Sequence, residues 1–470
     1  MDNQEFTKHL HAVGEWIARY QREVEGYPVC AQTRPGALKA GLPVSPPRTG
    51  EAMEAILEDF QDLVMPGITH WQHPSYFGYF PANASPPSVL AEMLTAGLGV
   101  IAFNWEASPA ATELEERMME WLRQAIGLPG NFTGVIQSTA SEATLCALLT
   151  ARERLCGFTT NETGLQGAGR LTAFCSDEAH SSVDKAMRIA GLGSVNLRKV
   201  PTDTAFAMSP EALEAAIRDD IEQGARPVCV IATLGATGTS GFDSLTAIGE
   251  ICRRHDVWLH VDAAWAGSAL VLEDCRWMIE GIEHADSFLF NPHKWLLTNF
   301  DCTAYFVRDT TALTNTLGIT PEYLKTSAGD VTDFRDWGVP LGRRFRALKL
   351  WFVLRAYGLE GLQHHIRGHI AMAQELGARI EAEPDFELVV PPRLALLCFR
   401  YCPNRSYDDE HIDELNQRLL ASVNASGKTY LTHARARGHY VIRFAIGQTF
   451  TEPRHVDAAW RLITSLARQL

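Results

Sequence analysis

The spacing of hydrophobic and polar residues changes along the chain. Between about Thr133 and Val307, short apolar runs bounded by turn residues are separated by segments with the spacing of amphipathic helices. Short buried strands that alternate with helices are typical of a mostly parallel α/β sheet. The runs that we expect to form strands are Gly134–Gln137, Leu171–Cys175, Asn196–Val200, Val228–Ala232, Trp258–Val261, Ser287–Phe290 and Thr303–Val307.

The segments between these runs carry helix signals. Ser209-Pro210-Glu211 combines a good N-cap residue with a proline that suits the first turn. Further helices are predicted over Glu142–Leu155, Ser182–Ala190 and Leu245–His255. Ligands of such sheets bind beyond the carboxyl ends of the strands, so the residues after each run are the candidate site.

The regions on either side of the sheet have other patterns. An amphipathic helix over about Glu5–Glu23 precedes a stretch rich in Pro and Gly, which predicts an N-terminal arm that packs on a partner subunit. After Arg343 a helical pattern runs through Trp351 to Gly358, followed by a small C-terminal α+β domain. The elements expected in that domain are the helix Glu410–Ser422 and the strands Ala395–Arg400 and His439–Ala445.

Length and composition narrow the organisation and the partners. A chain of 470 residues and 52.0 kDa exceeds one ordinary core, and we expect the division 1–85, 86–358 and 359–470. The net charge of −14 disfavours nucleic acid and anionic membranes as partners. The absence of a signal-peptide pattern and of a membrane-length apolar run predicts a cytoplasmic protein. The ten cysteines have no zinc-type spacing, so no metal is expected.

Two strand ends carry small hydroxyl residues or a histidine. Ser138-Thr139-Ala140-Ser141 follows the first run and opens a helix, where free N–H groups favour a phosphate, although such residues are also ordinary helix caps. His180 follows the second run in Ser176-Asp177-Glu178-Ala179-His180. This position suits a base, a ligand or a stacking plate, and equally a polar loop residue.

An acid and a lysine follow two further strands. Asp262 comes directly after Trp258–Val261 and precedes two alanines. Lys294, in Asn291-Pro292-His293-Lys294-Trp295, stands behind an apolar strand, and a desolvated lysine is a usable amine nucleophile toward a carbonyl. The glycines that follow Thr233 do not form GxGxxG at a helix start, which disfavours a nicotinamide cofactor.

Together these strand ends meet the needs of pyridoxal phosphate. A lysine holds the aldehyde carbon, an acid keeps the pyridine nitrogen protonated, and an imidazole covers one face of the ring. The helix N-terminus holds the phosphate. We therefore predict a pyridoxal-phosphate enzyme centred on Lys294, Asp262 and His180.

The motifs around these residues resemble those of the group II pyridoxal-phosphate decarboxylases, specifically the aromatic-L-amino-acid decarboxylase branch, and are similar to bacterial L-DOPA decarboxylases. The likeness extends over nearly the whole chain. Its motifs are His73-Pro74 through Phe80-Pro81, Ser176–Ser182, His260-Val261-Asp262-Ala263-Ala264, Asn291-Pro292-His293-Lys294-Trp295, Pro340-Leu341-Gly342-Arg343-Arg344 and Val441-Ile442-Arg443-Phe444-Ala445. The resemblance implies the aspartate-aminotransferase fold (pyridoxal-phosphate fold type I), an α/β fold whose mostly parallel seven-stranded sheet has helices on both faces. It also implies an obligate homodimer whose two chains share the active sites.

The resemblance assigns a role to each residue that matches a family motif. It makes Lys294 the Schiff-base lysine, Asp262 the partner of the pyridine nitrogen and His180 the residue stacked on the ring. Tyr323 matches the tyrosine of a mobile catalytic loop, here Pro321–Asp333, which helps to protonate Cα. The other cofactor positions are Thr139, Ala140, Ser141, Thr237, Ala264, Asn291 and His293.

Substrate-facing positions are implied in the same way. Those that match the pocket are Trp71, Tyr79, Phe80, Ala82 and Gly342, and those that match residues donated by the partner subunit are Ile101 and Phe103. Two positions depart from the family's usual pattern. Ala82 stands where the mammalian enzymes carry Thr, which removes a hydroxyl facing a catechol ring. Trp265 stands where Tyr is usual, which changes the packing beside the cofactor ring.

These residues predict decarboxylation of an aromatic L-amino acid to its amine and carbon dioxide. L-DOPA is favoured over tryptophan, 5-hydroxytryptophan, tyrosine and phenylalanine, and Gly342, a Ser in relatives that take histidine, leaves room for a wide ring or else only permits a turn. An aldehyde synthase is the alternative activity, although in the family it accompanies loss of the tyrosine that Tyr323 matches. The aromatic pocket segment disfavours an acidic-amino-acid decarboxylase, and the intact Lys294 and Asp262 disfavour a non-catalytic cofactor-binding protein.

Overall fold

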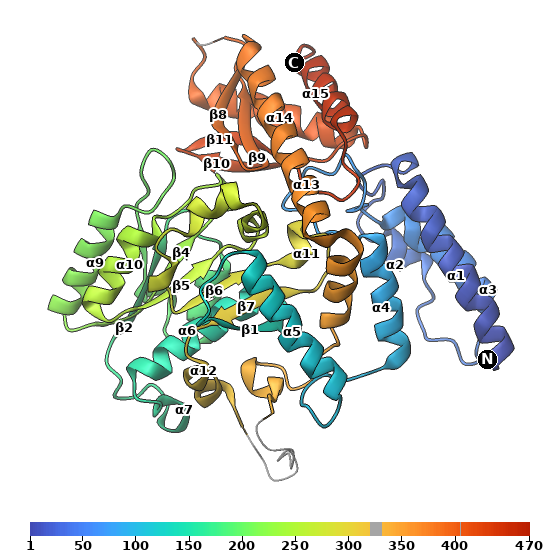
Figure 1. Ribbon diagram of the computed structural model, residues 1–470. Helices are drawn as coiled ribbons and strands as arrows, with labels where there is room; N and C mark the ends of the chain where they lie inside the picture. Colours follow the sequence, from blue (N-terminus) through green and yellow to red (C-terminus); the bar gives the residue numbers. More distant parts are fainter. Residues whose placement is uncertain (320–330, 405) are drawn as a thin grey trace. The chain divides into compact units, whose positions relative to one another are not determined.

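The computed structural model describes residues 1–319, 331–404 and 406–470 (Figure 1). Its contacts divide the chain into two compact units. The larger unit is Ala82–Ile370, and the smaller unit joins Met1–Pro81 to Ala371–Leu470. The N-terminal segment thus shares a unit with the C-terminal segment of its own chain. The predicted packing of this segment on a partner subunit stays a prediction.

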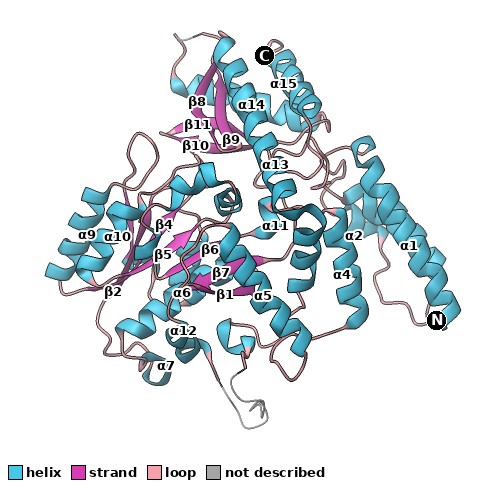
Figure 2. Ribbon diagram, viewed as in Figure 1, coloured by secondary structure: helices cyan, strands magenta, loops and turns pink. Residues whose placement is uncertain are grey.

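The larger unit is built on a seven-stranded sheet with the strand order β1-β7-β6-β5-β4-β2-β3 (Figure 2). The strands β2 to β6 run parallel wherever they pair, and β7 runs antiparallel to its neighbours β6 and β1. This confirms the predicted mostly parallel seven-stranded sheet. The strands are β1 (Thr133–Gln137), β2 (Leu171–Ser176), β3 (Leu197–Val200), β4 (Arg226–Thr233), β5 (Trp258–Asp262), β6 (Ser287–Phe290) and β7 (Thr303–Val307).

Helices cover both faces of this sheet, as predicted. On one face, α6 (Ala140–Leu155) and α8 (Ser182–Ile189) pack in an apolar cluster with residues of the strands. On the other face, α9 (Pro210–Glu222) and α10 (Leu245–His255) pack on each other and on β4. The remaining α-helices of the unit are α4 (Pro86–Leu98), α5 (Pro109–Ala125), α7 (Thr160–Thr163), α11 (Pro292–Trp295), α12 (Thr310–Leu317) and the first part of α13 (Ala347–Ala382).

The carboxyl ends of β1, β2, β4, β5 and β6 meet at one edge of the sheet, because these strands run in the same direction. The antiparallel β7 begins at this edge, which places Thr303 opposite Gln137. The register pairs Asp262 at the end of β5 with Leu289 of β6. Leu289 belongs to the apolar cluster that includes α6, so the Asp262 side chain lies on the face covered by α6.

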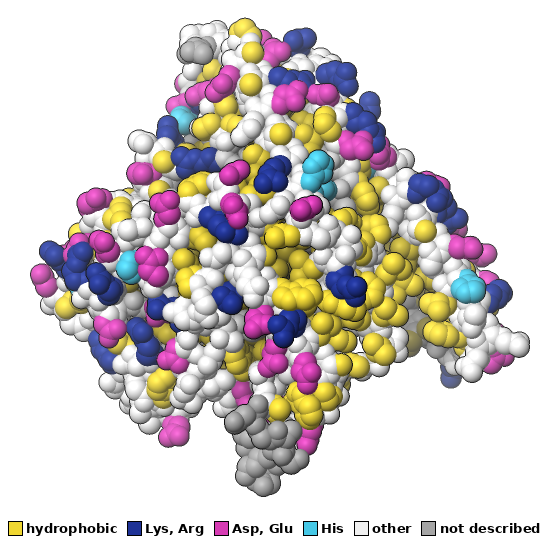
Figure 3. Space-filling model, in the orientation of Figure 1, with side chains coloured by type: hydrophobic (Ala, Val, Ile, Leu, Met, Phe, Trp, Pro, Cys, Tyr) yellow, Lys and Arg dark blue, Asp and Glu magenta, His cyan; other side chains and the backbone are white. Residues whose placement is uncertain are grey.

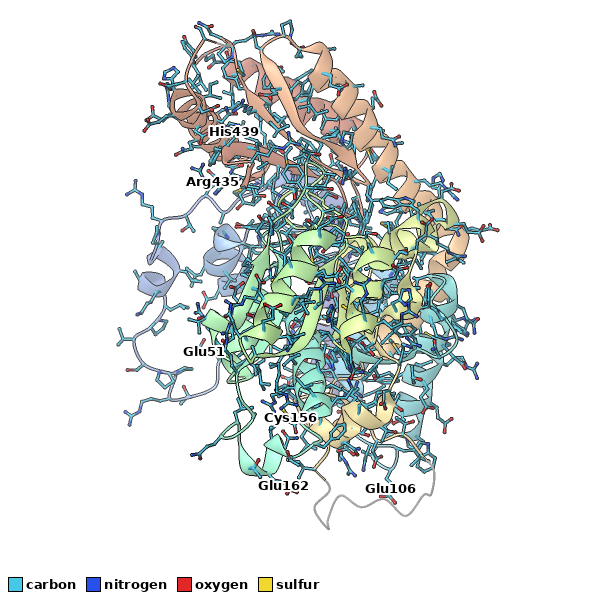
Figure 4. All side chains as sticks on the ribbon, turned by 90° about the vertical axis from the view of Figure 1, so that its left-hand side faces the viewer. Glu51, Glu106, Cys156, Glu162, Arg435 and His439 are labelled. Atoms are coloured by element: carbon cyan, nitrogen blue, oxygen red, sulfur yellow. The ribbon has the colours of Figure 1, made fainter. Side chains whose placement is uncertain are left out.

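The smaller unit contains a four-stranded antiparallel sheet with the order β10-β11-β9-β8, which confirms the predicted C-terminal α+β elements. Backbone hydrogen bonds attach the first segment of the chain to it, from Val29 to Gly427 at 2.8 Å and from Phe77 to Tyr430 at 2.9 Å. Arg435 and His439, which flank the turn between β10 and β11, are labelled in Figure 4. The elements are α1 (Asn3–Glu23), α2 (Ala37–Gly41), α3 (Met53–Asp59), β8 (Phe386–Arg393), β9 (Leu396–Tyr401), α14 (Asp409–Ala425), β10 (Thr432–Ala436), β11 (His439–Ala445) and α15 (Pro453–Ala467).

The long helix α13 is interrupted once. Gly358 has φ 63° and ψ 174°, a left-handed φ that glycine adopts without strain. The helix predicted through Trp351 to Gly358 is confirmed, because the non-helical Gly358 separates it from a second helix that continues to Ala382. The expected domain boundary at 358/359 coincides with this kink, whereas the contacts divide the units after Ile370.

Candidate active site

The N-terminus of α6 lies beyond the end of β1, where the sequence predicts a phosphate site. Thr139 is the N-cap residue, with an extended backbone and its Oγ1 3.4 Å from the N–H of Glu142. Ala140 and Ser141 form the first turn of the helix. First-turn N–H groups have no partner within a helix and attract anions. The first turn of α6 can therefore accept an anion, and its role as the phosphate cradle stays a prediction.

Thr303 links this cradle to the lysine segment. Its hydroxyl lies 2.9 Å from Oδ1 of Asn291 and 3.3 Å from the carbonyl oxygen of Ser138. The N–H of the buried Asn291 donates to the carbonyl oxygen of Ala264 at 2.9 Å. These bonds join the ends of β1, β5 and β6. Thr303 is not among the predicted site residues, because the candidates follow the ends of strands, whereas Thr303 begins an antiparallel one.

Lys294 is half-buried in the short helix α11 that follows β6. Asn83 holds the backbone around it, because the Asn83 side-chain amide donates to the carbonyl oxygen of Lys294 and the Asn83 N–H donates to that of His293 at 3.1 Å. His293 is buried and accepts a hydrogen bond from the N–H of Cys302 at 3.0 Å. Ala82, the substituted pocket position, precedes Asn83 and therefore lies beside the lysine segment.

Electrostatics keep the His293 imidazole neutral. Burial, and secondarily the charge of Lys294, lower its pKa to about 3. A neutral ring at this position adds no second positive charge beside the lysine amine. At neutral pH, His293 thus acts in the site as a neutral hydrogen-bonding group and not as a charge.

Asp262 is buried at the end of β5. Its Oδ1 accepts the N–H of Ala264 at 3.0 Å, and its carbonyl oxygen accepts the N–H of Leu234 at 2.8 Å. The half-buried Thr237 lies in the loop after β4. In the same loop, the Thr239 hydroxyl donates to Glu178 at 2.9 Å, which connects this loop to the segment that carries His180.

The His180 ring is held in one tautomer. Its Nδ1 lies 3.1 Å from the N–H of Ser182 and 2.9 Å from the Ser182 hydroxyl. A backbone N–H only donates, so Nδ1 is the acceptor and the neutral ring carries its hydrogen on Nε2. Desolvation lowers the pKa of His180; the nearby charges of Asp262 and Lys294 oppose each other, Asp262 raising this pKa and Lys294 lowering it.

Asp262 and Lys294 therefore both stand close enough to His180 to shift its pKa. A buried carboxylate, a fixed imidazole with an exposed side, a half-buried amine and a helix N-terminus meet at one edge of the sheet. This donor set fits pyridoxal phosphate: an amine for its aldehyde, an acid for its ring nitrogen and free N–H groups for its phosphate. Among the described residues, no group of three or more His, Cys, Asp or Glu side chains is placed to bind a metal ion.

Three predicted substrate positions also belong to the larger unit. Ile101 is exposed and pairs with Arg344 in an isolated β-bridge, and Phe103 is half-buried. A Cβ added to Gly342 meets no atom of the chain within 4 Å, and its φ is outside the left-handed region. Gly342 therefore has no conformational need for glycine within its own chain.

The remaining substrate positions lie in the smaller unit, among an aromatic cluster. Trp71 stacks on Tyr79 with ring centroids 5.8 Å apart, and Phe80 lies under the guanidinium of Arg443 at 5.2 Å. Their part in substrate binding stays a prediction. Tyr323 and most of its predicted loop lie outside the described residues.

Two cavities lie away from Lys294, Asp262 and His180. One of about 660 Å³ is bordered by α5 and by residues that include Trp105, Arg123 and Trp337. The other, of about 330 Å³, adjoins the C-terminal end of α6 near Cys156, which Figure 4 labels, and so lies at the opposite end of this helix from the cradle. Neither is lined by Lys294, Asp262 or His180.

Comparison with known proteins decides the family. The family described as "Pyridoxal-dependent decarboxylase conserved domain" matches residues 35–402. The chain belongs to this family. The family's description names both the pyridoxal cofactor and the decarboxylase activity that the sequence predicts.

Relatives of this pyridoxal-dependent decarboxylase include plant enzymes. It is 42% identical to tyrosine decarboxylase 4 of Petroselinum crispum, over 100% of this chain and 94% of that protein. A crystal structure of Oryza sativa TDC with PLP and tryptamine has a TM-score of 0.96 and 37% identity, over 100% and 99% of the two chains. That of Rhodiola rosea 4-hydroxyphenylacetaldehyde synthase has a TM-score of 0.93 and 37% identity, again over 100% and 99%. The predicted closeness to bacterial L-DOPA decarboxylases stays a prediction.

Proposed function

We propose that this decarboxylase converts aromatic L-amino acids to their amines with release of carbon dioxide. The observation that carries the proposal is the meeting of Lys294, Asp262, His180 and the α6 N-terminus at one sheet edge in a chain of this family. The names of the relatives add support, because they include a tyrosine decarboxylase and a TDC solved with tryptamine. L-DOPA is the substrate that we favour, since the motifs resemble those of L-DOPA decarboxylases.

The residues divide the work. When bound, pyridoxal phosphate accepts the electrons that remain on Cα when the bond to the carboxylate breaks. Lys294 holds the cofactor, Asp262 stabilises a proton on the ring nitrogen, and His180 covers the ring with its Nδ1 occupied by Ser182. Tyr323 delivers the proton to Cα after carbon dioxide leaves. Because the N–H of Ser182 fixes the His180 tautomer, the Nε2 hydrogen is available to a substrate carboxylate.

Aldehyde synthesis is the second candidate activity, and the likeness to an aldehyde synthase supports testing it. Purified enzyme loaded with pyridoxal phosphate is given L-DOPA, tyrosine, tryptophan, 5-hydroxytryptophan, phenylalanine and histidine in turn. Carbon dioxide, amine, aldehyde and ammonia are measured for each. Equal molar amounts of amine and carbon dioxide support decarboxylase activity. Formation of aldehyde and ammonia with uptake of oxygen supports aldehyde synthase activity. No carbon dioxide from any substrate refutes both.

We also infer a homodimer. On α4, Leu90, Leu94 and Leu98 are 56%, 51% and 61% exposed at successive turns, and Ile101 follows at 56%. Figure 3 shows hydrophobic side chains gathered on the face that carries α4. An apolar stripe of this kind marks a surface that another chain covers. The amphipathic α1 contains no buried residue, which supports an arm that packs on the partner. Light scattering of the purified protein tests the mass, and a monomer refutes the inference.

We also infer a cytoplasmic location. Among the residues that the structure describes, no helix combines the length and apolar character that a bilayer span requires. The cysteines are thiols, and all but Cys30 and Cys156 are buried. Thiols are typical of a reducing compartment, which supports the cytoplasmic location predicted from the sequence.

A further inference from the structure

Arg343, the residue after Gly342, is a buried cation at the junction of several segments. It is 8% exposed, and its guanidinium donates to the carbonyl oxygen of Ala102 at 3.0 Å and to that of Ile136 at 2.8 Å. It forms an ion pair with Glu115, which is 1% exposed, and lies over the ring of Phe334 at 4.9 Å. One planar group thus binds four separate parts of the larger unit.

The side chains of Arg343 and Glu115 form hydrogen bonds with the unpaired side of the outer strand β1. β1 is the outer strand, with β7 as its neighbour on one side only. On the other side, the N–H of Ile136 donates to Glu115 at 2.8 Å and its carbonyl oxygen accepts from Arg343. An unpaired edge strand otherwise leaves such groups without partners. The two side chains therefore fix β1 three residues before Thr139 caps the phosphate cradle.

The same arginine fixes the segment that bears the predicted substrate positions. Its carbonyl oxygen accepts the N–H of Ala102 at 2.8 Å, and its side chain binds the carbonyl oxygen of the same residue. Ala102 lies between Ile101 and Phe103, and Gly342 precedes Arg343. The predicted substrate positions are thereby joined to the strand that leads into the candidate cofactor site.

From this geometry we propose that Arg343 is a positioning residue that holds the substrate-selecting segment against the cofactor-bearing strand. The expected effect on the KM for substrates rests on the proposed function, whereas the expected effect on cofactor binding rests on the cofactor site alone. Its ion pair is buried, so removal of the charge is expected to destabilise the fold through Glu115. Lysine is the informative replacement, because it keeps the charge but lacks the planar fork that reaches two carbonyl oxygens.

The test compares R343K with the wild-type enzyme at a temperature well below unfolding of either. Pyridoxal phosphate is titrated into protein stripped of cofactor, and its Kd is read from absorbance and tryptophan fluorescence. In R343K we expect the cofactor Kd and the KM for aromatic substrates each to rise about tenfold, with kcat changed by less than about threefold. R218K is the control, because Arg218 lies on α9 with a side chain that is 63% exposed, and it is expected to keep both constants.

The outcomes separate positioning from stability. R343K that folds with the wild-type cofactor Kd and KM refutes the proposal, even if its unfolding temperature falls. If R343K does not fold, E115Q decides: it keeps an acceptor for Ile136 but weakens the hold on Arg343, and unchanged constants in that variant refute the proposal as well. A wild-type enzyme without decarboxylase activity refutes the proposed function, while the cofactor Kd still tests Arg343.

Discussion

Trp265 stacks on Trp295 in the interior of the larger unit, with ring centroids 4.7 Å apart and planes inclined by 14°. Trp265 follows Asp262 by three residues, and Trp295 follows Lys294 by one. Trp295 is held in turn by a hydrogen bond of 2.9 Å from its indole N–H to His369. The stack therefore connects the turn of the acid to the turn of the lysine.

Replacing Trp265 by Tyr, the family's usual residue, tests the stack. The smaller ring leaves space beside Trp295, so the free energy of unfolding should fall by about 2 kcal/mol. Urea unfolding at fixed protein and cofactor concentrations measures it. Trp121→Tyr, at a position that is 40% exposed, controls for the loss of an indole elsewhere. Equal stability of the Trp265 variant and the wild type would show that the stack contributes nothing to the fold.

The lysine assignment has a direct test. Lys294→Ala should abolish the visible absorbance of lysine-bound cofactor and nearly all turnover, because no other amine is placed at the aldehyde. Borohydride reduction followed by peptide mapping locates the attachment in the wild type. The exposed Lys185, replaced by Ala, serves as control. A Lys294 variant that retained reducible cofactor on another lysine would refute the assignment.

Much of the central fold could be predicted because its strands are buried on both sides. The runs Ser287–Phe290 and Thr303–Val307 coincide with β6 and β7, since continuous apolar residues bounded by turns leave little ambiguity. The edge strands β8 and β10 were missed. β8 contains Pro391-Pro392, and β10 reads Thr-His-Ala-Arg-Ala, so neither has the β-branched or alternating pattern of a central strand.

The site shows the same division. Asp262 and Lys294 could be identified as candidates because one ends a buried strand and the other follows one, and ligands bind beyond such strand ends. The distant residues that hold the lysine segment and β1 in place could not. Asn83 bonds to Lys294 across 211 positions, and Arg343 bonds to Ile136 across 207. Such contacts depend on the packing of distant segments, which no local pattern records.

The predicted loop tyrosine is tested by product analysis. Tyr323→Phe should leave cofactor and substrate binding largely intact, because only the hydroxyl is removed. Amine formation should slow, and aldehyde with ammonia should appear as oxygen is consumed, since Cα loses its proton donor. Tyr407→Phe, at an exposed position of the smaller unit, is the control. An unchanged yield of amine would remove Tyr323 from the mechanism.

A buried histidine predicts the response to acid. Burial lowers the pKa of His260 to about 3, whereas an unfolded histidine titrates near about 6.5. The folded state therefore excludes the protonated form, and the stability from neutral His260 is complete above the unfolded pKa and declines as pH falls toward the folded one. Between pH 6 and 4, His260→Asn should reduce the pH slope of the unfolding free energy by about 1.4 kcal/mol per unit. Denaturation series at each pH measure it, and an unchanged slope would exclude His260 as the titrating group.

Substrate choice is tested at Gly342. A Cβ at this position meets no atom of its own chain within 4 Å, and the backbone is not left-handed, so Gly342→Ser should change the free energy of unfolding by less than about 0.5 kcal/mol. The hydroxymethyl group occupies space that a wide ring needs and offers a hydrogen bond to a smaller one. The ratio of kcat/KM for L-DOPA to that for histidine should therefore fall, by about tenfold if the volume is decisive.

The control is Gly368→Ser, an exposed glycine of α13 where an added Cβ also meets nothing. If the ratio stays the same in both variants, Gly342 does not select the substrate, and the preference for L-DOPA has to come from the aromatic positions Trp71, Tyr79 and Phe80.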